Sequence, residues 1–133
     1  MGEGAPRSEV DRLPPMALYV VGFLRRPATL LPPLPPSEAN RLQEDHLAHL
    51  RRLREEGELI LTGPFEEDTE LRGLLVFRTS SLDHARELMG EDPIVRSGRL
   101  LLELRTWYTL ASLGGLGAPA VSPGPGPLTF ESD

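Results

Sequence analysis

This chain of 133 residues contains four apolar runs of strand length and two amphipathic segments of helix length. The runs include "ALYVVGFL", "GLLVFR" and "RLLLELRTWY", which are rich in leucine, β-branched and aromatic residues. Strands are therefore expected at residues 17–24, 59–62, 73–78 and 99–108. Between the first two strands the segment "RPATLLPPLPP" contains five prolines, which exclude a regular element and predict an extended loop.

The two amphipathic segments carry start and stop signals for helices. We expect Ser37 to cap the first helix and Gly57 to end it, and Ser81 to cap a second helix that stops near Gly90. The order is then strand, helix, strand, strand, helix, strand. Two split βαβ units with right-handed crossovers form a four-stranded antiparallel sheet with both helices on one face. The predicted fold class is α+β, with the ferredoxin-like βαββαβ arrangement.

The composition of the chain divides it into three parts. We expect an N-terminal arm at 1–15, one domain at 16–111 and a C-terminal tail at 112–133, whose glycine and proline content cannot build its own core. The start of the chain lacks the features of a secretory signal, no apolar run is long enough to span a membrane, and cysteine is absent. A soluble cytoplasmic protein is the expectation.

The predicted strands are almost continuously apolar. An antiparallel sheet with one solvated face should alternate apolar and polar residues, and these strands do not. The face away from the helices should therefore be covered as well, most simply by the same face of a second subunit. The sequence predicts a homodimer that packs sheet to sheet.

The charge pattern excludes some functions. A formal charge of −6 argues against a nucleic-acid surface, and the cluster Arg51, Arg52 and Arg54 is expected to form a solvated helix face. Every basic residue other than histidine is arginine, so no lysine exists to form a Schiff base. A small-molecule ligand is the expected partner.

Two histidines, His46 and His49, lie on the apolar stripe of the first predicted helix together with Leu42, Leu50 and Leu53. The fold brings the ends of the first two strands, the start of this helix and the end of the second helix to one edge of the sheet. His46 points under that edge, and Asp92 is the nearest carboxylate that the chain order brings there. The pair could act as a general acid and base near neutral pH. Alternatively, it could be a buried histidine bonded to an aspartate that only caps a turn before proline.

Other chemistries have less support in the sequence. His46, His49 and Asp92 could reach one metal ion, but no HExxH or similar spacing occurs, and no Gly-x-Ser-x-Gly elbow is present. We therefore expect neither a metal nor a cofactor. His49 is expected to be a histidine at the edge of the core or at an interface.

The segment "HLAHLRRLREEGELILTGP" resembles the signature of the YCII-related (YciI-like) proteins, and "EDPIVRSG" resembles the second motif of that family. The resemblance covers about residues 16–110. It implies a dimeric α/β barrel of two ferredoxin-like subunits, with a cleft in which His46 and Asp92 match a proposed catalytic dyad. The family includes an enzyme that removes chloride from a chlorinated hydroxyhydroquinone, and it is similar in fold to muconolactone isomerase. Ile94 stands where an aromatic residue is common, and the loop at 26–36 looks longer than usual.

These observations predict a small cofactor-independent enzyme in which His46, oriented by Asp92, moves a proton on a small cyclic or aromatic-derived molecule. Isomerisation or elimination of a leaving group would fit. The alternative is a non-catalytic small-molecule-binding or accessory dimer, and a purely structural dimer is the third hypothesis. Five further residues are expected at the ligand: Gly63 and Pro64 as the cleft floor, Ile94 in the wall, and Arg96 and Ser97 as partners of a carboxylate or phenolate.

Overall fold

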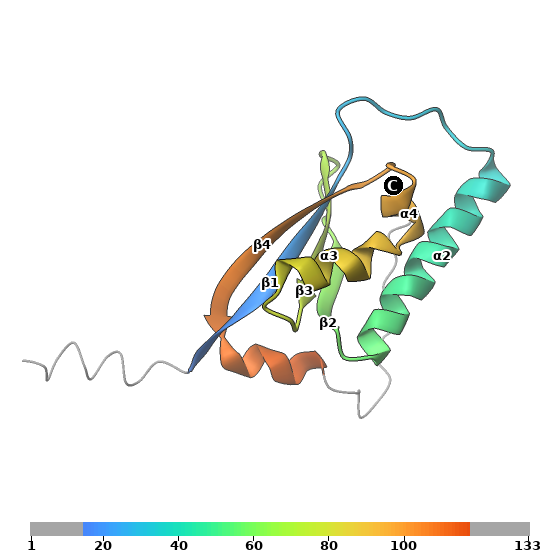
Figure 1. The fold of residues 1–133 in the computed structure, drawn as a ribbon. Helices are drawn as coiled ribbons and strands as arrows, with labels where there is room; N and C mark the ends of the chain where they lie inside the picture. Colours follow the sequence, from blue (N-terminus) through green and yellow to red (C-terminus); the bar gives the residue numbers. More distant parts are fainter. Residues whose placement is uncertain (1–14, 118–133) are drawn as a thin grey trace, which may run out of the picture.

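The computed structural model describes residues 15–117, so most of the predicted arm and of the predicted tail lies outside the described residues. Figure 1 shows the elements, which in chain order are β1 (Met16–Arg25), α2 (Pro36–Glu55), β2 (Leu59–Pro64), β3 (Leu71–Phe77), α3 (Leu82–Gly90), α4 (Pro93–Arg96), β4 (Leu101–Leu110) and the 3-10 helix η1 (Ala111–Gly117). Among these residues no helix has the length and apolar character that a membrane crossing requires.

The four strands form one sheet in the order β2-β3-β1-β4, and each neighbouring pair is antiparallel. This order with intervening helices is the predicted ferredoxin-like arrangement, which is therefore confirmed. β1 is central and pairs along its whole length with β4, whereas its pairing with β3 shifts register between Leu24 and Arg25. Figure 1 shows α2 and α3 together on one side of the sheet.

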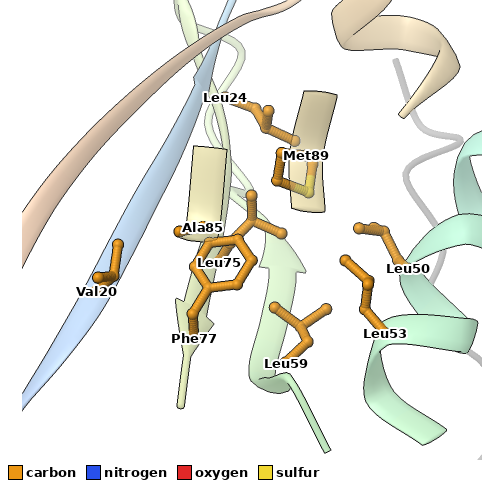
Figure 2. Packing of buried hydrophobic residues seen from close by; sticks show 9 residues of the cluster. All are labelled: Val20, Leu24, Leu50, Leu53, Leu59, Leu75, Phe77, Ala85 and Met89. Carbon is orange, nitrogen blue, oxygen red and sulfur yellow. The ribbon is translucent and has the colours of Figure 1, made fainter. Parts of the chain in front are cut away.

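The main core lies between the helices and the sheet. Alternate residues of β1, such as Val20 and Leu24, face the helices. The leucine stripe of α2 packs against these side chains. Burial of each large apolar side chain contributes about 1.5 to 3 kcal/mol. Figure 2 shows how the side chains of this cluster converge: Val20, Leu24, Leu50, Leu53, Leu59, Leu75, Phe77, Ala85 and Met89.

The opposite face of the sheet carries a second, smaller cluster of Tyr19, Val21, Ile60 and Val76. The sequence pattern predicted that a second subunit covers this face, but part of the cover comes from η1 of the same chain. Leu113 packs against the cluster, and the Tyr19 hydroxyl donates a hydrogen bond of 2.7 Å to the Ala111 carbonyl. A single chain therefore shields only a portion of the face.

The helix ends agree with the sequence in part. Ser81 caps α3, because its Oγ accepts a hydrogen bond from the His84 amide, and Gly57 follows α2 with a φ of 81°. The prediction that Ser37 caps α2 is wrong: the helix begins at Pro36, whose fixed φ suits the first helical position and whose missing N–H needs no partner there. The four-residue helix α4 was not predicted, since one turn is too short to show periodicity.

Candidate active site

His46 and Asp92 meet beneath the edge of the sheet. His46 lies in the third turn of α2, and Asp92 precedes α4. Both side chains are almost fully buried, at 1% and 0% exposure, and the His46 Nδ1 lies 2.6 Å from Asp92 Oδ1. The contact predicted between these two residues is therefore present.

The second oxygen of Asp92 has a different task. Oδ2 accepts hydrogen bonds of 3.1 Å from the backbone amides of Ile94 and Val95, which makes Asp92 the N-cap of α4, with Pro93 at the first helical position. Asp92 therefore makes the contacts expected under both hypotheses from the sequence: it caps a turn before proline, and it binds the imidazole of His46. The cap fixes the carboxylate in place, so it holds the His46 ring in one orientation.

This bond sets the tautomer of His46. A carboxylate accepts a hydrogen bond from the Nδ1–H group, and Nε2 is then the ring nitrogen that carries the lone pair. An arrangement of this kind prepares an imidazole to take up a proton through Nε2 and to return it.

His46 lines a pocket of about 390 Å³, a volume in the range of small-molecule sites. We call it the His46 pocket. Its walls come from the end of β1, the Pro-rich loop, the first half of α2, the start of β3, α4 and the residues before β4, which is the edge predicted from the topology. Its lining residues are Leu24, Arg26, Leu30, Leu34, Ala39, Leu42, Gln43, His46, Arg72, Gly73, Ile94, Arg99 and Leu100.

The polar side chains of the His46 pocket differ in their partners. The guanidinium groups of Arg26 and Arg72 each donate to the same Asp68 oxygen at 3.1 Å, and Arg72 also donates to the Thr69 carbonyl. The guanidinium of Arg99 forms no ion pair or hydrogen bond within residues 15–117, although its backbone amide donates to Ser97 Oγ at 3.2 Å.

Gln43 is a further polar side chain of the pocket, whereas Arg25 lies on the other face of the sheet. The side-chain amide nitrogen of Gln43 is buried and has no hydrogen-bond acceptor in the part of the chain that the structure describes. Arg25 ends β1 and is bound to Glu103 on β4. The hydrogen bond between them raises the pKa of Arg25 and lowers the pKa of Glu103, so this arginine is already neutralised within the protein.

His49 lies one turn further along α2, and both of its ring nitrogens have partners. Its Nδ1 lies 2.8 Å from Arg52 Nη2, and its Nε2 lies 2.8 Å from the Leu88 carbonyl oxygen. Because a guanidinium can only donate, Nδ1 is the acceptor and Nε2 is the donor. Leu88 lies in the last turn of α3, where helix carbonyls lack partners within the helix. His49 therefore links α2 to the end of α3.

The structure separates the predicted ligand contacts. Ile94 lines the His46 pocket, whereas Gly63, Pro64, Arg96 and Ser97 do not. Gly63 and Pro64 end β2 as predicted, but β2 is an edge strand, and the pocket is lined by residues of β1 and β3 instead. A ligand contact at these four residues stays a prediction.

Arg96 and Ser97 lie at the far end of α4. Arg96 faces a second hollow beside His49 and Arg52, and the Ser97 hydroxyl donates to the Ile94 carbonyl at 2.7 Å. One turn of helix after Asp92 carries both residues away from the His46 pocket.

Sequence reasoning missed the polar lining residues Arg26, Gln43, Arg72 and Arg99. Arg99 and Arg26 had a usable signal, because each is adjacent to a strand end at the edge already identified. Gln43 lies three residues before His46 on the same helix face. Arg72 had no such signal, since its position follows from the register shift between β1 and β3.

The described residues contain no group of three or more His, Asp or Glu side chains arranged to hold a metal ion. His46 and His49, which could have shared an ion by spacing alone, instead bind a carboxylate and a carbonyl.

Comparison with known proteins gives one family match. A family model described as the YCII-related domain matches residues 17–107. None of the curated proteins matches the chain significantly. Among solved structures, the chain is similar to a 5-chloro-2-hydroxyhydroquinone dehydrochlorinase from Burkholderia phenoliruptrix AC1100 in complex with 2,5-dihydroxybenzoquinone. The identity is 18%, the TM-score is 0.48, and the match covers 68% of this chain and 93% of the other.

Proposed function

The chain belongs to the YCII-related domain family, and we propose that it is a small-molecule enzyme in which His46 transfers a proton to or from a ligand in the His46 pocket. The observation that carries the proposal is the buried hydrogen bond of 2.6 Å between His46 Nδ1 and Asp92 beside a pocket that His46 lines. His49 shows no comparable arrangement, since a carbonyl and an arginine occupy its ring.

In the proposed mechanism Asp92 keeps the proton of the neutral ring on Nδ1. Nε2 then takes a proton from a carbon or oxygen atom of the ligand, and the carboxylate stabilises the imidazolium that forms. Return of that proton to another ligand atom completes an isomerisation. Departure of a leaving group from the deprotonated ligand completes an elimination, after which the imidazolium loses its proton to water.

Deuterium exchange tests the proposal even while the natural substrate is unidentified. Small phenols, lactones and dicarboxylates are incubated with the protein in D2O, and NMR follows both deuterium uptake and conversion of each compound. We expect at least one compound to exchange or react. His46→Gln should lower that rate by about 10²- to 10⁴-fold, the usual contribution of a general acid or base.

The matched control is His49→Gln, which changes the same residue type one turn away and should leave the rate close to that of the wild type. Equal rates for wild type and His46→Gln would overturn the proposal. Ligand binding without exchange or conversion of any compound would favour the alternative, a small-molecule-binding protein.

We also propose that two copies associate through the outer face of the sheet. Three large apolar side chains on this face are exposed in the single chain: Leu61 at 41%, Leu101 at 49% and Trp107 at 43%. Trp107 pairs with Tyr19 and Leu61 pairs with Val76, and both partners belong to the cluster on this face. Light scattering should give the mass of a dimer for the wild type and of a monomer for Trp107→Glu; a monomeric wild type would contradict this proposal.

A further inference from the structure

The His46 pocket has a charge opposite to that of the whole chain. The protein carries a formal charge of −6, yet the lining of this pocket contains three arginines and neither aspartate nor glutamate. A positive potential inside a cleft attracts and retains ligands of negative charge. The lining thus indicates the charge of the ligand as well as its position.

Arg99 is the arginine best placed to bind that ligand. It is half-buried in the segment between α4 and β4 and forms no ion pair within residues 15–117. The two other pocket arginines, Arg26 and Arg72, share one oxygen of Asp68. A guanidinium presents a planar set of N–H donors that matches a carboxylate, and the resulting charge-assisted hydrogen bonds are strong.

Gln43 supplies a second donor. Its side-chain amide nitrogen is buried, and no acceptor for it exists among the described residues. A buried donor without a partner is unfavourable, so a ligand oxygen at this position would stabilise the complex. Gln43 and His46 are neighbours on one face of α2, which brings this donor and the histidine to the same ligand.

The remaining walls of the pocket are apolar. Leu30 and Leu34 come from the Pro-rich loop, and Leu42 comes from α2. Ile94 comes from α4, and Leu100 directly follows Arg99 before β4. Such walls fit the body of a hydrocarbon ring, and about 390 Å³ accommodates a single ring with its substituents.

We propose that the His46 pocket binds a monocyclic organic anion, a carboxylate or a phenolate, through Arg99, with Gln43 as the second donor. This inference rests on the proposed function, because it names the substrate class of the same site. It assigns the binding of charge to Arg99, which lies outside the contacts predicted from the sequence.

Calorimetry with pairs of charged and neutral probes tests the inference. Benzoate is compared with benzamide, and 4-nitrophenolate with nitrobenzene. We expect at least one anion to bind the wild type more tightly than its neutral partner, and Arg99→Gln to weaken that anion by about 10- to 100-fold, as loss of a hydrogen bond to a charged group predicts. Preference for benzoate identifies a carboxylate ligand, and preference for 4-nitrophenolate identifies a phenolate.

The matched control is Arg54→Gln, which removes the same charge from an exposed position near the end of α2, outside the His46 pocket; it should leave anion binding unchanged. Gln43→Leu provides a second variant that should weaken the anion by a smaller factor. Three results would each overturn the inference: neutral probes that bind as tightly as the anions, equal losses for Arg99→Gln and Arg54→Gln, or no anion binding at all.

The probes do not react, so the two proposals can fail separately. Benzoate binding that depends on Arg99, in a protein that exchanges no proton with any compound, would contradict the proposed function alone. Turnover of neutral compounds that depends on His46, without anion binding, would contradict the further inference alone.

Discussion

His46 and His49 lie one turn apart on the same apolar stripe of α2, and both are almost fully buried. His46 binds the Asp92 carboxylate through Nδ1 and lines the His46 pocket, whereas His49, which borders the second hollow, has an acceptor at Nε2 and a donor at Nδ1. The two residues share their type, their helix and their burial. What distinguishes them is what α3 and α4 bring to each ring, so position on the helix alone does not define a functional histidine.

The largest effect on the proton-transfer rate should come from Asp92→Asn, which removes the carboxylate that accepts a hydrogen bond from His46 Nδ1. Asparagine is as good an N-cap as aspartate, so its oxygen can stay on the Ile94 and Val95 amides. Its amide group then faces Nδ1 and donates to it, which moves the ring proton to Nε2. With the wrong tautomer the proton-transfer rate should fall by up to about 10⁴-fold, as in the serine-protease triad.

The control for that variant is Glu91→Gln, which changes the adjacent carboxylate on the His49 side, at 3.5 Å from Arg52. Its rate should match that of the wild type in the same deuterium-exchange assay. A similar loss in both variants would mean that the segment before α4 acts by its charge rather than by orienting His46.

Replacement of His46 by leucine should destabilise the fold more than replacement by glutamine. Leucine leaves the fully buried Asp92 without its side-chain partner, at a cost of about 3 kcal/mol in the free energy of unfolding, whereas glutamine can still donate to the carboxylate. Chemical denaturation measures both variants. Equal stability for the two would show that the carboxylate does not need a donor at this position.

His49→Leu should change stability without changing catalysis. The Leu88 carbonyl at the end of α3 loses its donor, and we expect the free energy of unfolding to fall by about 1 to 2 kcal/mol. The rate in the exchange assay should remain that of the wild type at temperatures where the variant is folded. A large loss of rate would place His49 in the reaction and remove the distinction between the two histidines.

The smallest effect is expected for Arg52→Gln. Arg52 donates to His49 Nδ1 from an exposed position, with 52% of its side chain accessible. Solvent can replace such a donor, so the free energy of unfolding should fall by less than about 1 kcal/mol. A larger loss would show that the arginine, and not the Leu88 carbonyl, holds His49 in place.

The sequence predicted the fold well because the fold depends on patterns that extend over many residues. Strand periods, the leucine stripe of α2 and the Ser81 cap are local signals, and together they allow only one simple arrangement. The sequence did not predict the short helix α4 or the start of α2 at Pro36, because each of these features depends on only one or two residues. The contact between His46 and Asp92 followed from chain order at the sheet edge and from the family resemblance.

The remainder of the site depends on features that a sequence does not display. The register shift between β1 and β3 helps to set which residues at the sheet edge line the pocket. The single turn of α4 places Arg96 at the second hollow, beside His49, and not at the His46 pocket. Arg99 lies just before β4 and directly after the segment "EDPIVRSG". The family resemblance pointed to Arg96 and Ser97 within that segment as ligand contacts, and not to Arg99. Pairing of the other arginines is what makes Arg99 distinctive, and pairing requires a structure.

Long-range nitrogen–proton NMR of the histidine side chains tests the central claim most directly, because it reports the tautomer of each ring and its response to a ligand. We predict that neutral His46 carries its proton on Nδ1 and neutral His49 on Nε2. Addition of the best-binding probe should shift the signals of His46 and leave those of His49 in place. A proton on Nε2 of His46, or a ligand that shifts His49 and not His46, would contradict the distinct roles assigned to the two histidines.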